Sequence, residues 1–204
     1  MEIKQRLLIN LIIACIFLSG CGGEKAEIKN FDVDNFEILS AKGYWDEAIR
    51  QAENWQEKAY LTHVSIEIPL PNSGRGESEI LGFHFLTFDS DILKLTVACK
   101  NNMCSQRETE HNPDFPLQHT KPIQKDDFSL TSEQAFEIGI QEGGINYIYN
   151  EDVVVSLILS RDGNDNSGPV IWVVNFIQFR TGDFPEQLMI EIDANTGEVL
   201  ETSQ

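Results

Sequence analysis

The spacing of hydrophobic and polar residues changes twice along the first half of the chain. In 44–60, apolar residues recur every three to four positions, which predicts an amphipathic helix. In 61–68, every second residue is apolar, which predicts a strand with one buried face. Apolar runs at 80–88 and 92–99 predict two further strands. The inner face of the predicted helix consists of Trp45, Ala48, Ile49, Ala52, Trp55 and Ala59.

The second half repeats the same order of elements. Helical spacing in 130–143 follows Thr131 and Gln134, which match a capping box at a helix start. Strands are predicted afterwards at 152–160, 169–179 and 187–193. The shared order of helix and strands favours a tandem duplication of one small α+β unit.

A long polar stretch separates the two halves. Residues 100–127 contain Pro113, Pro116 and Pro122 and lack apolar alternation, which indicates an irregular connection. The fold class is therefore α+β, with two small units that each pack one helix on an antiparallel sheet. The predicted organisation is a unit at 37–107, a connection at 108–128 and a unit at 129–204.

The N-terminus is typical of an export signal rather than of a folded element. Lys4 and Arg6 precede a twelve-residue apolar run at 7–18, which is too short for a comfortable membrane span. The following "LSGC" at 18–21 resembles the lipobox of bacterial lipoprotein precursors. This resemblance implies removal of the signal peptide 1–20 and lipid attachment at Cys21, with palmitate-type acyl chains. Residues 21–36 would then form a polar tether.

The lipobox also bears on localisation in the cell envelope. Residue 22 is Gly rather than Asp, which favours an outer-membrane anchor facing the periplasm in a Gram-negative cell. In a Gram-positive cell, the lipid would hold the protein on the outer face of the plasma membrane.

The charge of the chain narrows the classes of partner. It carries 33 acidic and 15 basic residues, for a formal net charge of -18. Nucleic acid is a poor partner, because a basic stripe that would neutralise phosphates is missing. An anionic membrane surface would repel the polypeptide, so we expect the lipid to supply the membrane contact.

Two cysteines remain once Cys15 leaves with the signal peptide and Cys21 carries lipid. Cys99 and Cys104 are close in sequence, and an exported protein with one such pair favours a local disulfide. A zinc site with His111 and His119 and a redox-active pair are the alternatives. The spacing matches no common zinc pattern, and a redox pair is usually Cys-x-x-Cys.

Two strands of the second half are apolar on both faces. In 152–160, for example, Val153 and Val155 point to one face, and Val154 and Ile158 point to the other. One helix covers only one face of a sheet, so the second face must meet the other half, another copy or a different protein. Packing of one half against the other is the simplest of these expectations.

Polar clusters in the second half invite catalytic or metal chemistry. Asp193 and Glu198 lie close in sequence, but Asn195, Thr196 and Gly197 between them predict a hairpin turn. The loop 161–168 fails the calcium-loop pattern, which requires Gly and Glu where Ser167 and Val173 stand. We therefore assign no catalytic residue, no metal and no cofactor, and we do not expect an enzyme.

The segment 129–202 resembles the PepSY domain. The resemblance rests on "LTSEQAFEIG", on Ile171, Trp172 and Val174, and on "IEIDANTGEVLET" with its turn signature Asp193, Thr196, Gly197 and Glu198. It implies one helix on an antiparallel sheet and brings no catalytic residues. Family members occur in propeptides of secreted metallopeptidases and in envelope proteins, with a proposed role in restraining peptidases.

The resemblance leads to a functional hypothesis. We expect a non-catalytic, lipid-anchored envelope protein that binds a protein partner, either a peptidase or another envelope protein. The alternative is an envelope lipoprotein that binds a small ligand or responds to a metal, with its site between the halves.

Overall fold

The computed structural model describes residues 38–68, 70, 80–88, 90–110, 121–162, 168–179 and 185–204. All of them belong to one compact unit, Asp34–Gln204. The predicted signal peptide, the lipid-attachment residue Cys21 and the tether lie outside the described residues, as do His111 and His119.

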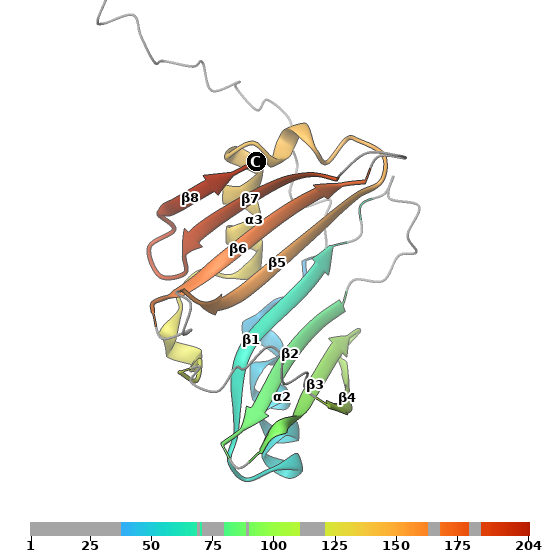
Figure 1. The fold of residues 1–204 in the computed structure, drawn as a ribbon, viewed down its shortest axis with the longest axis vertical. Coiled ribbons are helices and arrows are strands. Elements are labelled where there is room, and N and C mark those ends of the chain that lie inside the picture. The colour runs from blue at the N-terminus through green and yellow to red at the C-terminus, as the bar shows by residue number, and fades with distance from the viewer. Residues whose placement is uncertain are drawn as a thin grey trace, which may run out of the picture. The chain divides into compact units, whose positions relative to one another are not determined.

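The described residues form eight strands and two α-helices, so the fold is α+β (Figure 1). The strands build one antiparallel sheet in the order β4-β3-β2-β1-β5-β6-β7-β8. The helices are α2 (Ala41–Trp55) and α3 (Ser132–Gln141), and short 3-10 turns are η2 (Lys125–Asp127) and η3 (Gly144–Asn146). The strands are β1 (Ala59–Ile68), β2 (Ile80–Thr87), β3 (Ser90–Lys100), β4 (Met103–Glu110), β5 (Val153–Arg161), β6 (Val170–Gln178), β7 (Glu186–Asp193) and β8 (Val199–Ser203).

The strand order is symmetric about the junction between β1 and β5. From this junction, four strands run outward in chain order on each side, and a helix precedes each set of four. The junction itself is antiparallel and pairs Val64 with Leu159 and Ile66 with Leu157. The two halves of the chain thus meet edge to edge within a single sheet.

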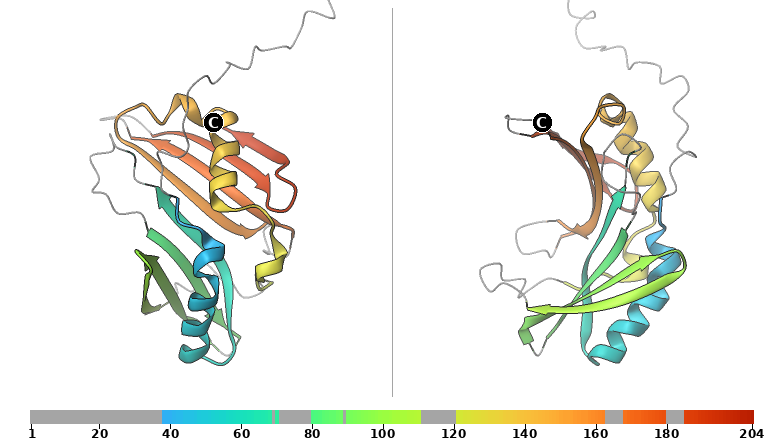
Figure 2. Two further views of the ribbon diagram at one scale, coloured as in Figure 1. Left: turned by 180° about the vertical axis from the view of Figure 1, so that it is seen from behind. Right: turned by 90° about the vertical axis from the view of Figure 1, so that its right-hand side faces the viewer.

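Both helices lie on the same face of this sheet (Figure 2). Helix α2 contacts β1 to β4, and α3 contacts β5 and β6. Aromatic rings connect the two halves of the core: Trp45 of α2 lies 5.6 Å from Phe128, which lies 6.4 Å from Trp172 of β6. These three side chains are almost fully buried, so one hydrophobic core runs beneath both helices.

The start of α3 follows the predicted chemistry. The Thr131 hydroxyl accepts from the Gln134 backbone N–H, and the Gln134 side chain accepts from the Thr131 N–H, so the predicted capping box is present. Gly139 and Gly144 lie against Val174 and Phe176, where a Cβ atom would come within 2.8 and 2.2 Å of side-chain atoms. Their small size therefore allows α3, which contains Gly139, and η3, which contains Gly144, to lie close to the sheet.

Buried Arg161 holds the connection between the halves. Its guanidinium donates to the backbone oxygens of Lys121 (3.0 Å), Pro122 (2.9 Å) and Gly168 (3.1 Å), and it forms an ion pair with Asp127. The buried charge is therefore neutralised and its donors are used, as a buried guanidinium requires.

The first predicted helix is too long at its C-terminal end. Helix α2 ends at Trp55, and Ala59, which we assigned to the inner helical face, is the first residue of β1. Gln56 is already extended, with φ −150° and ψ 128°. Tyr60 can then pair with Leu86 of β2, and this strand pairing competes successfully with helical spacing.

The irregular connection predicted for 100–127 is wrong over its first third. Residues Met103–Glu110 form β4, which runs across the boundary placed between 107 and 108. Most residues of β4 are exposed because it is the edge strand of the sheet. The strand therefore lacks the apolar alternation that identifies a half-buried strand in a sequence.

Candidate functional site

The turn between β7 and β8 is organised by one carboxylate. Asp193 Oδ1 accepts from the backbone N–H groups of Asn195 (2.9 Å) and Thr196 (2.8 Å) and from the Thr196 hydroxyl (3.0 Å). These hydrogen bonds, led by the one from the Thr196 N–H, lower the pKa of Asp193. Gly197 adopts φ +77°, which favours glycine. Asp193 thus acts as the acceptor of an Asx turn, and its lowered pKa is unsuited to general acid catalysis near neutral pH.

The same turn also fixes the start of α3. The Ala194 carbonyl accepts from the backbone N–H groups of Ser129 and Leu130, each at 2.9 Å. The Asn195 side chain donates to the Asp127 carbonyl at 2.9 Å. The turn signature therefore connects the end of β7 to the segment that leads into the second helix.

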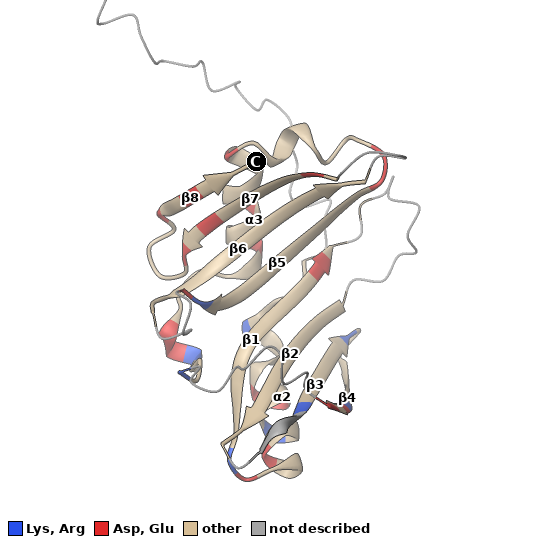
Figure 3. Ribbon diagram, in the orientation of Figure 1, with Lys and Arg blue, Asp and Glu red and all other residues tan. Residues whose placement is uncertain are grey.

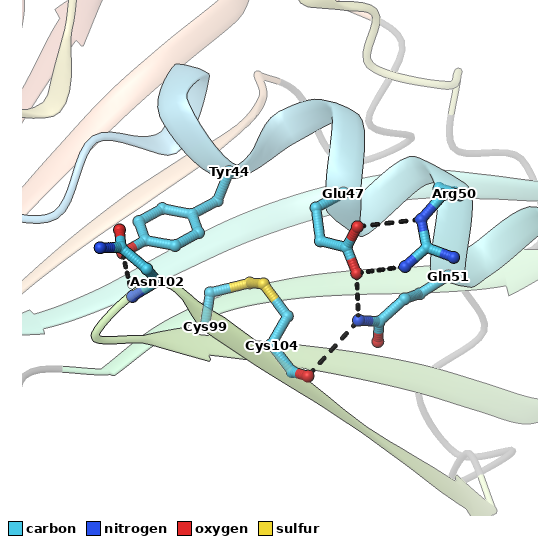
Figure 4. Close-up of a disulfide and its surroundings, with 7 residues drawn as sticks. All are labelled: Tyr44, Glu47, Arg50, Gln51, Cys99, Asn102 and Cys104. Atoms are coloured by element: carbon cyan, nitrogen blue, oxygen red, sulfur yellow. Dashed lines mark hydrogen bonds and ion pairs between the residues drawn. A yellow bond between two sulfur atoms is a disulfide. The ribbon is translucent and has the colours of Figure 1, made fainter.

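The β3–β4 hairpin occupies the corresponding place in the first half and contains the Cys99–Cys104 disulfide. The two cysteines are directly opposite each other in the strand register. Asn101 and Asn102 form its two-residue turn, with φ of 50° and 60°. Helix α2 contacts this hairpin, because Tyr44 accepts from the Asn102 N–H at 3.1 Å and Gln51 donates to the Cys104 carbonyl at 3.4 Å (Figure 4).

The face of the sheet opposite the helices, here called the open face, carries half-buried apolar side chains. Val154, Ile158, Val173 and Ile177 point to it from β5 and β6. Neither described helix covers it, and the first half of the chain extends the sheet sideways instead of packing against this face. The expectation that one half packs on the second face of the other is therefore wrong, because strand pairing at β1–β5 uses the edges and not the faces.

A polar cluster that the sequence reading missed lies on the open face of the first half. The rings of His63 and His84 stack with centroids 4.1 Å apart. His84 contacts the hydroxyls of Ser65 at 2.8 Å and Thr96 at 3.2 Å through its two ring nitrogens. Burial, followed by nearby Lys94, lowers the pKa of His63 to about 4, and burial also lowers the pKa of His84 to about 2.

Ser65 and His84 lie at the distance of a nucleophile and its general base. However, His84 lacks a suitable pKa and a carboxylate partner. A general base works best with a pKa near the operating pH, and the pKa of His84 lies far below it. The group on the far ring nitrogen is the Thr96 hydroxyl, which cannot stabilise an imidazolium as a carboxylate does. We therefore interpret this cluster as a polar part of a surface.

Described residues of the first half line hollows that could hold a ligand, and two of these bear on function. One, of about 500 Å³, lies beside the C-terminal part of α2 and is lined by Ile49, Ala52, Glu53, Glu57, Lys58, Ala59, Tyr60, Leu61, Phe85, Phe88, Pro122, Ile123 and Gln124. The second, of about 440 Å³, is lined by Ile80, Ala98, Cys99, Lys100, Met103, Cys104 and Ser105. Alternate residues of β3 and β4 share a face, so Ala98, Lys100 and Ser105 place the second hollow on the open face.

Charge on the open face differs between the outer strands of the two halves. Lys94, Lys100 and Arg107 occupy open-face positions on β3 and β4, whereas Glu191 and Glu201 occupy them on β7 and β8. Figure 3 shows basic positions on β3 and acidic positions on β7. Burial, followed by Glu201 and Asp162, raises the pKa of Glu191.

In the part of the chain that the structure describes, neither helix is long and apolar enough to cross a membrane. Within the same ranges, no three His, Cys, Asp or Glu side chains gather closely enough to hold a metal ion. Comparison of the chain with protein-family models, with curated proteins and with solved structures gives no match.

Proposed function

We propose that this protein is a non-catalytic, lipid-anchored protein of the cell envelope that binds a protein partner through the open face of its sheet. The lipobox at 18–21 supports the anchor. The observation that carries the binding role is the open face itself, where half-buried Val154, Ile158, Val173 and Ile177 lie on the side of the sheet away from both helices. Apolar side chains that gather on one face of a sheet and stay partly accessible there favour an interaction surface.

The partner class that we propose is a secreted or envelope peptidase, which the chain would restrain or modulate. The resemblance of 129–202 to the PepSY domain supports this choice. We also propose that 37–107 is a second, divergent PepSY-like unit. The symmetric strand order about β1–β5 and the matching positions of the β3–β4 and β7–β8 hairpins support a duplication.

The binding role is tested by capture from a solubilised envelope extract of the protein's own cell. The full chain, purified in detergent and immobilised, is compared with Ile158→Lys, which places a charge in the apolar part of the open face. Tyr149→Lys is the matched control, because Tyr149 is 66% exposed outside the sheet. We expect mass spectrometry to find a peptidase enriched on the parent and the control but not on Ile158→Lys. Equal enrichment on all three would contradict binding through the open face.

The anchor has its own test. Metabolic labelling with palmitate should label the parent chain but not Cys21→Ser. Labelling that persists in Cys21→Ser would overturn the lipoprotein assignment.

A second candidate function is the binding of a small apolar ligand. The hollow of about 500 Å³ beside α2 falls in the size range of ligand pockets and is partly walled by aromatic and aliphatic side chains. Stacked Tyr60 and Phe88, 4.3 Å apart, form part of it. We expect the neutral dye N-phenyl-1-naphthylamine to brighten with the parent chain and not with Ala52→Phe, which fills the hollow. Equal brightening with both would remove this candidate.

A further inference from the structure

One row of open-face residues crosses all eight strands. The strand pairing connects, in order from β4 to β8, Ser105, Ala98, Gly82, Ser65, Ile158, Val173, Glu191 and Glu201. We call this set the cross-sheet row. Its four members from the first half are small, and its four members from the second half are large. The hollow of about 440 Å³ lies at the small end, where it includes Ala98 and Ser105.

The two ends of the cross-sheet row also differ in charge. Lys100 lies two residues beyond Ala98 on β3, and Arg107 lies two residues beyond Ser105 on β4, so both face the open side on opposite flanks of the small end. The large end carries Glu191 and Glu201, which are paired across β7 and β8. Like charges directly opposite each other are unfavourable, and a cation brought between them would relieve this repulsion.

These two ends are related by the geometry of the sheet. A two-fold axis parallel to the strands, placed over the β1–β5 junction, would set β8 of a second copy over β4 and β7 over β3. Along the cross-sheet row, Glu201, Glu191 and Ile158 of one copy would then oppose small Ser105, Ala98 and Ser65 of the other. Val173 would oppose Gly82, where the His84 ring already lies over the backbone. Glu191 and Glu201 would enter the hollow between Lys100 and Arg107, and the same contacts would occur twice.

We propose that the open face binds a second copy of this chain, and that the two copies form a face-to-face dimer with the large end of each cross-sheet row over the small end of the other. This inference rests on the proposed function, because both assign the open face as the docking surface. Sheets pack face to face about 10 Å apart when their side chains interdigitate, and the small half of each row would face the large half of the other, which supplies that fit. A second copy and a peptidase would compete for this face.

Charge reversal tests the arrangement. In Lys100→Glu/Arg107→Glu, both ends of the row are acidic, and in Glu191→Lys/Glu201→Lys, both ends are basic. Each variant alone should dissociate, with the dimer dissociation constant raised at least roughly 100-fold. An equimolar mixture of the two should form a heterodimer, because every contact then joins opposite charges. Native mass spectrometry of the full chains released from detergent, with tags of different mass, measures all three states.

Matched controls separate this effect from a change in net charge. Lys58→Glu/Lys121→Glu and Glu53→Lys/Glu137→Lys reverse the same number of charges outside the strands of the sheet. Glu53 and Glu137 lie on the two helices, Lys58 lies in the turn after α2, and Lys121 lies in the connection. Both controls should remain dimers. Circular dichroism establishes that each variant is folded. Formation of the heterodimer on mixing is independent evidence that the two charge-reversed variants are folded.

Three results would overturn the proposal: a monomeric parent chain, dimers that survive either charge reversal, or folded reversed variants that fail to associate when mixed. The proposed function fails in a different way. A monomeric parent that still captures a peptidase, with capture lost in Ile158→Lys, keeps the function and removes the dimer. If the parent chain forms the dimer but captures no peptidase, the result supports the dimer and contradicts the peptidase role.

Discussion

The two outer hairpins occupy equivalent places in the two halves but are held by different chemistry. The β3–β4 turn is short, and a covalent bond between Cys99 and Cys104 joins its strands. The β7–β8 turn is longer, and the Asp193 carboxylate organises it through three hydrogen bonds. One hairpin therefore depends on the redox state of its surroundings, whereas the other depends on the ionisation of one acid.

The two hairpins also differ in their contacts with the rest of the chain. The first receives side-chain contacts from α2, through Tyr44 and Gln51. The second offers the Ala194 carbonyl to the backbone that leads into α3. Damage to the second hairpin should therefore spread further along the chain than damage to the first.

Among the substitutions that test this difference between the hairpins, Asp193→Ala should have the largest effect on stability. It removes all three acceptor contacts, and we expect a loss of about 2–3 kcal/mol in the free energy of unfolding, because hydrogen bonds to charged groups are among the stronger ones. Denaturant unfolding measures the loss, and hydrogen exchange should locate it in β7, β8 and the start of α3. Glu198→Ala in the same turn is the control. An equal loss in both variants would show that the Asp193 network has no special role.

The disulfide is expected to contribute slightly less. Cys99→Ala/Cys104→Ala should lower the free energy of unfolding by about 2 kcal/mol, because the closed loop is short and restricts few conformations of the unfolded chain. A reducing agent should produce the same loss in the parent and none in the variant. Hydrogen exchange in β7 and β8 should be unchanged, and faster exchange there would contradict the independence of the two hairpins.

The two halves should also differ in how their stability responds to acid. The pKa of His63 is lowered to about 4 from 6.5, so below pH 6.5 the unfolded state takes up a proton that the folded state excludes. Stability should therefore fall as the pH drops from 6.5 toward 4, by about 1–2 kcal/mol between pH 7 and pH 5. The stabilisation from Asp193 is fully present above pH 3.8, the ordinary pKa of an aspartate. It is lost only as the pH falls through the lowered pKa of Asp193 in the folded state.

Thermal unfolding at a series of pH values checks this sign. In His63→Gln, the loss between pH 7 and pH 5 should become smaller, while the loss below pH 4 should remain. His84, stacked on His63 and with a pKa of about 2, adds to the same slope, so His63→Gln/His84→Gln should flatten it more. A parent chain whose stability is constant between pH 7 and pH 5 would contradict the burial of these rings in the folded state.

Local patterns predicted the parts of the fold whose burial follows the sequence. The alternation in 61–68 identified β1 and the apolar run in 80–88 identified β2, because each strand buries apolar residues. The edge strand β4 was not predicted, because its residues are mostly exposed and its stability comes from pairing with β3. Burial alternation is absent where both faces of a strand are exposed, as they are in β4.

The same distinction applies to the candidate sites. Cys99 with Cys104, and Asp193 with its turn, are close in sequence, so spacing alone suggested their roles. The His63–His84 stack and the cross-sheet row depend on the register of strands that are far apart in sequence. The local alternation places His63 and Ser65 on one face of their strand, but it does not say which residues of another strand lie beside them.

The smallest expected effect concerns the contact between α2 and the first hairpin. Tyr44→Phe removes the hydroxyl that accepts from the Asn102 N–H at 3.1 Å and donates to Asn102 Oδ1 at 3.5 Å. We expect a loss of about 0.5–1 kcal/mol, because both neutral hydrogen bonds are exposed and the second is long. The disulfide already fixes the neighbouring strands, so the turn should keep its conformation in oxidised protein. In Cys99→Ala/Cys104→Ala, the same Tyr44→Phe change should cost more, because Tyr44 then restrains a looser turn. A double-mutant cycle measures this coupling, and strict additivity would show that the tyrosine and the disulfide stabilise the hairpin independently.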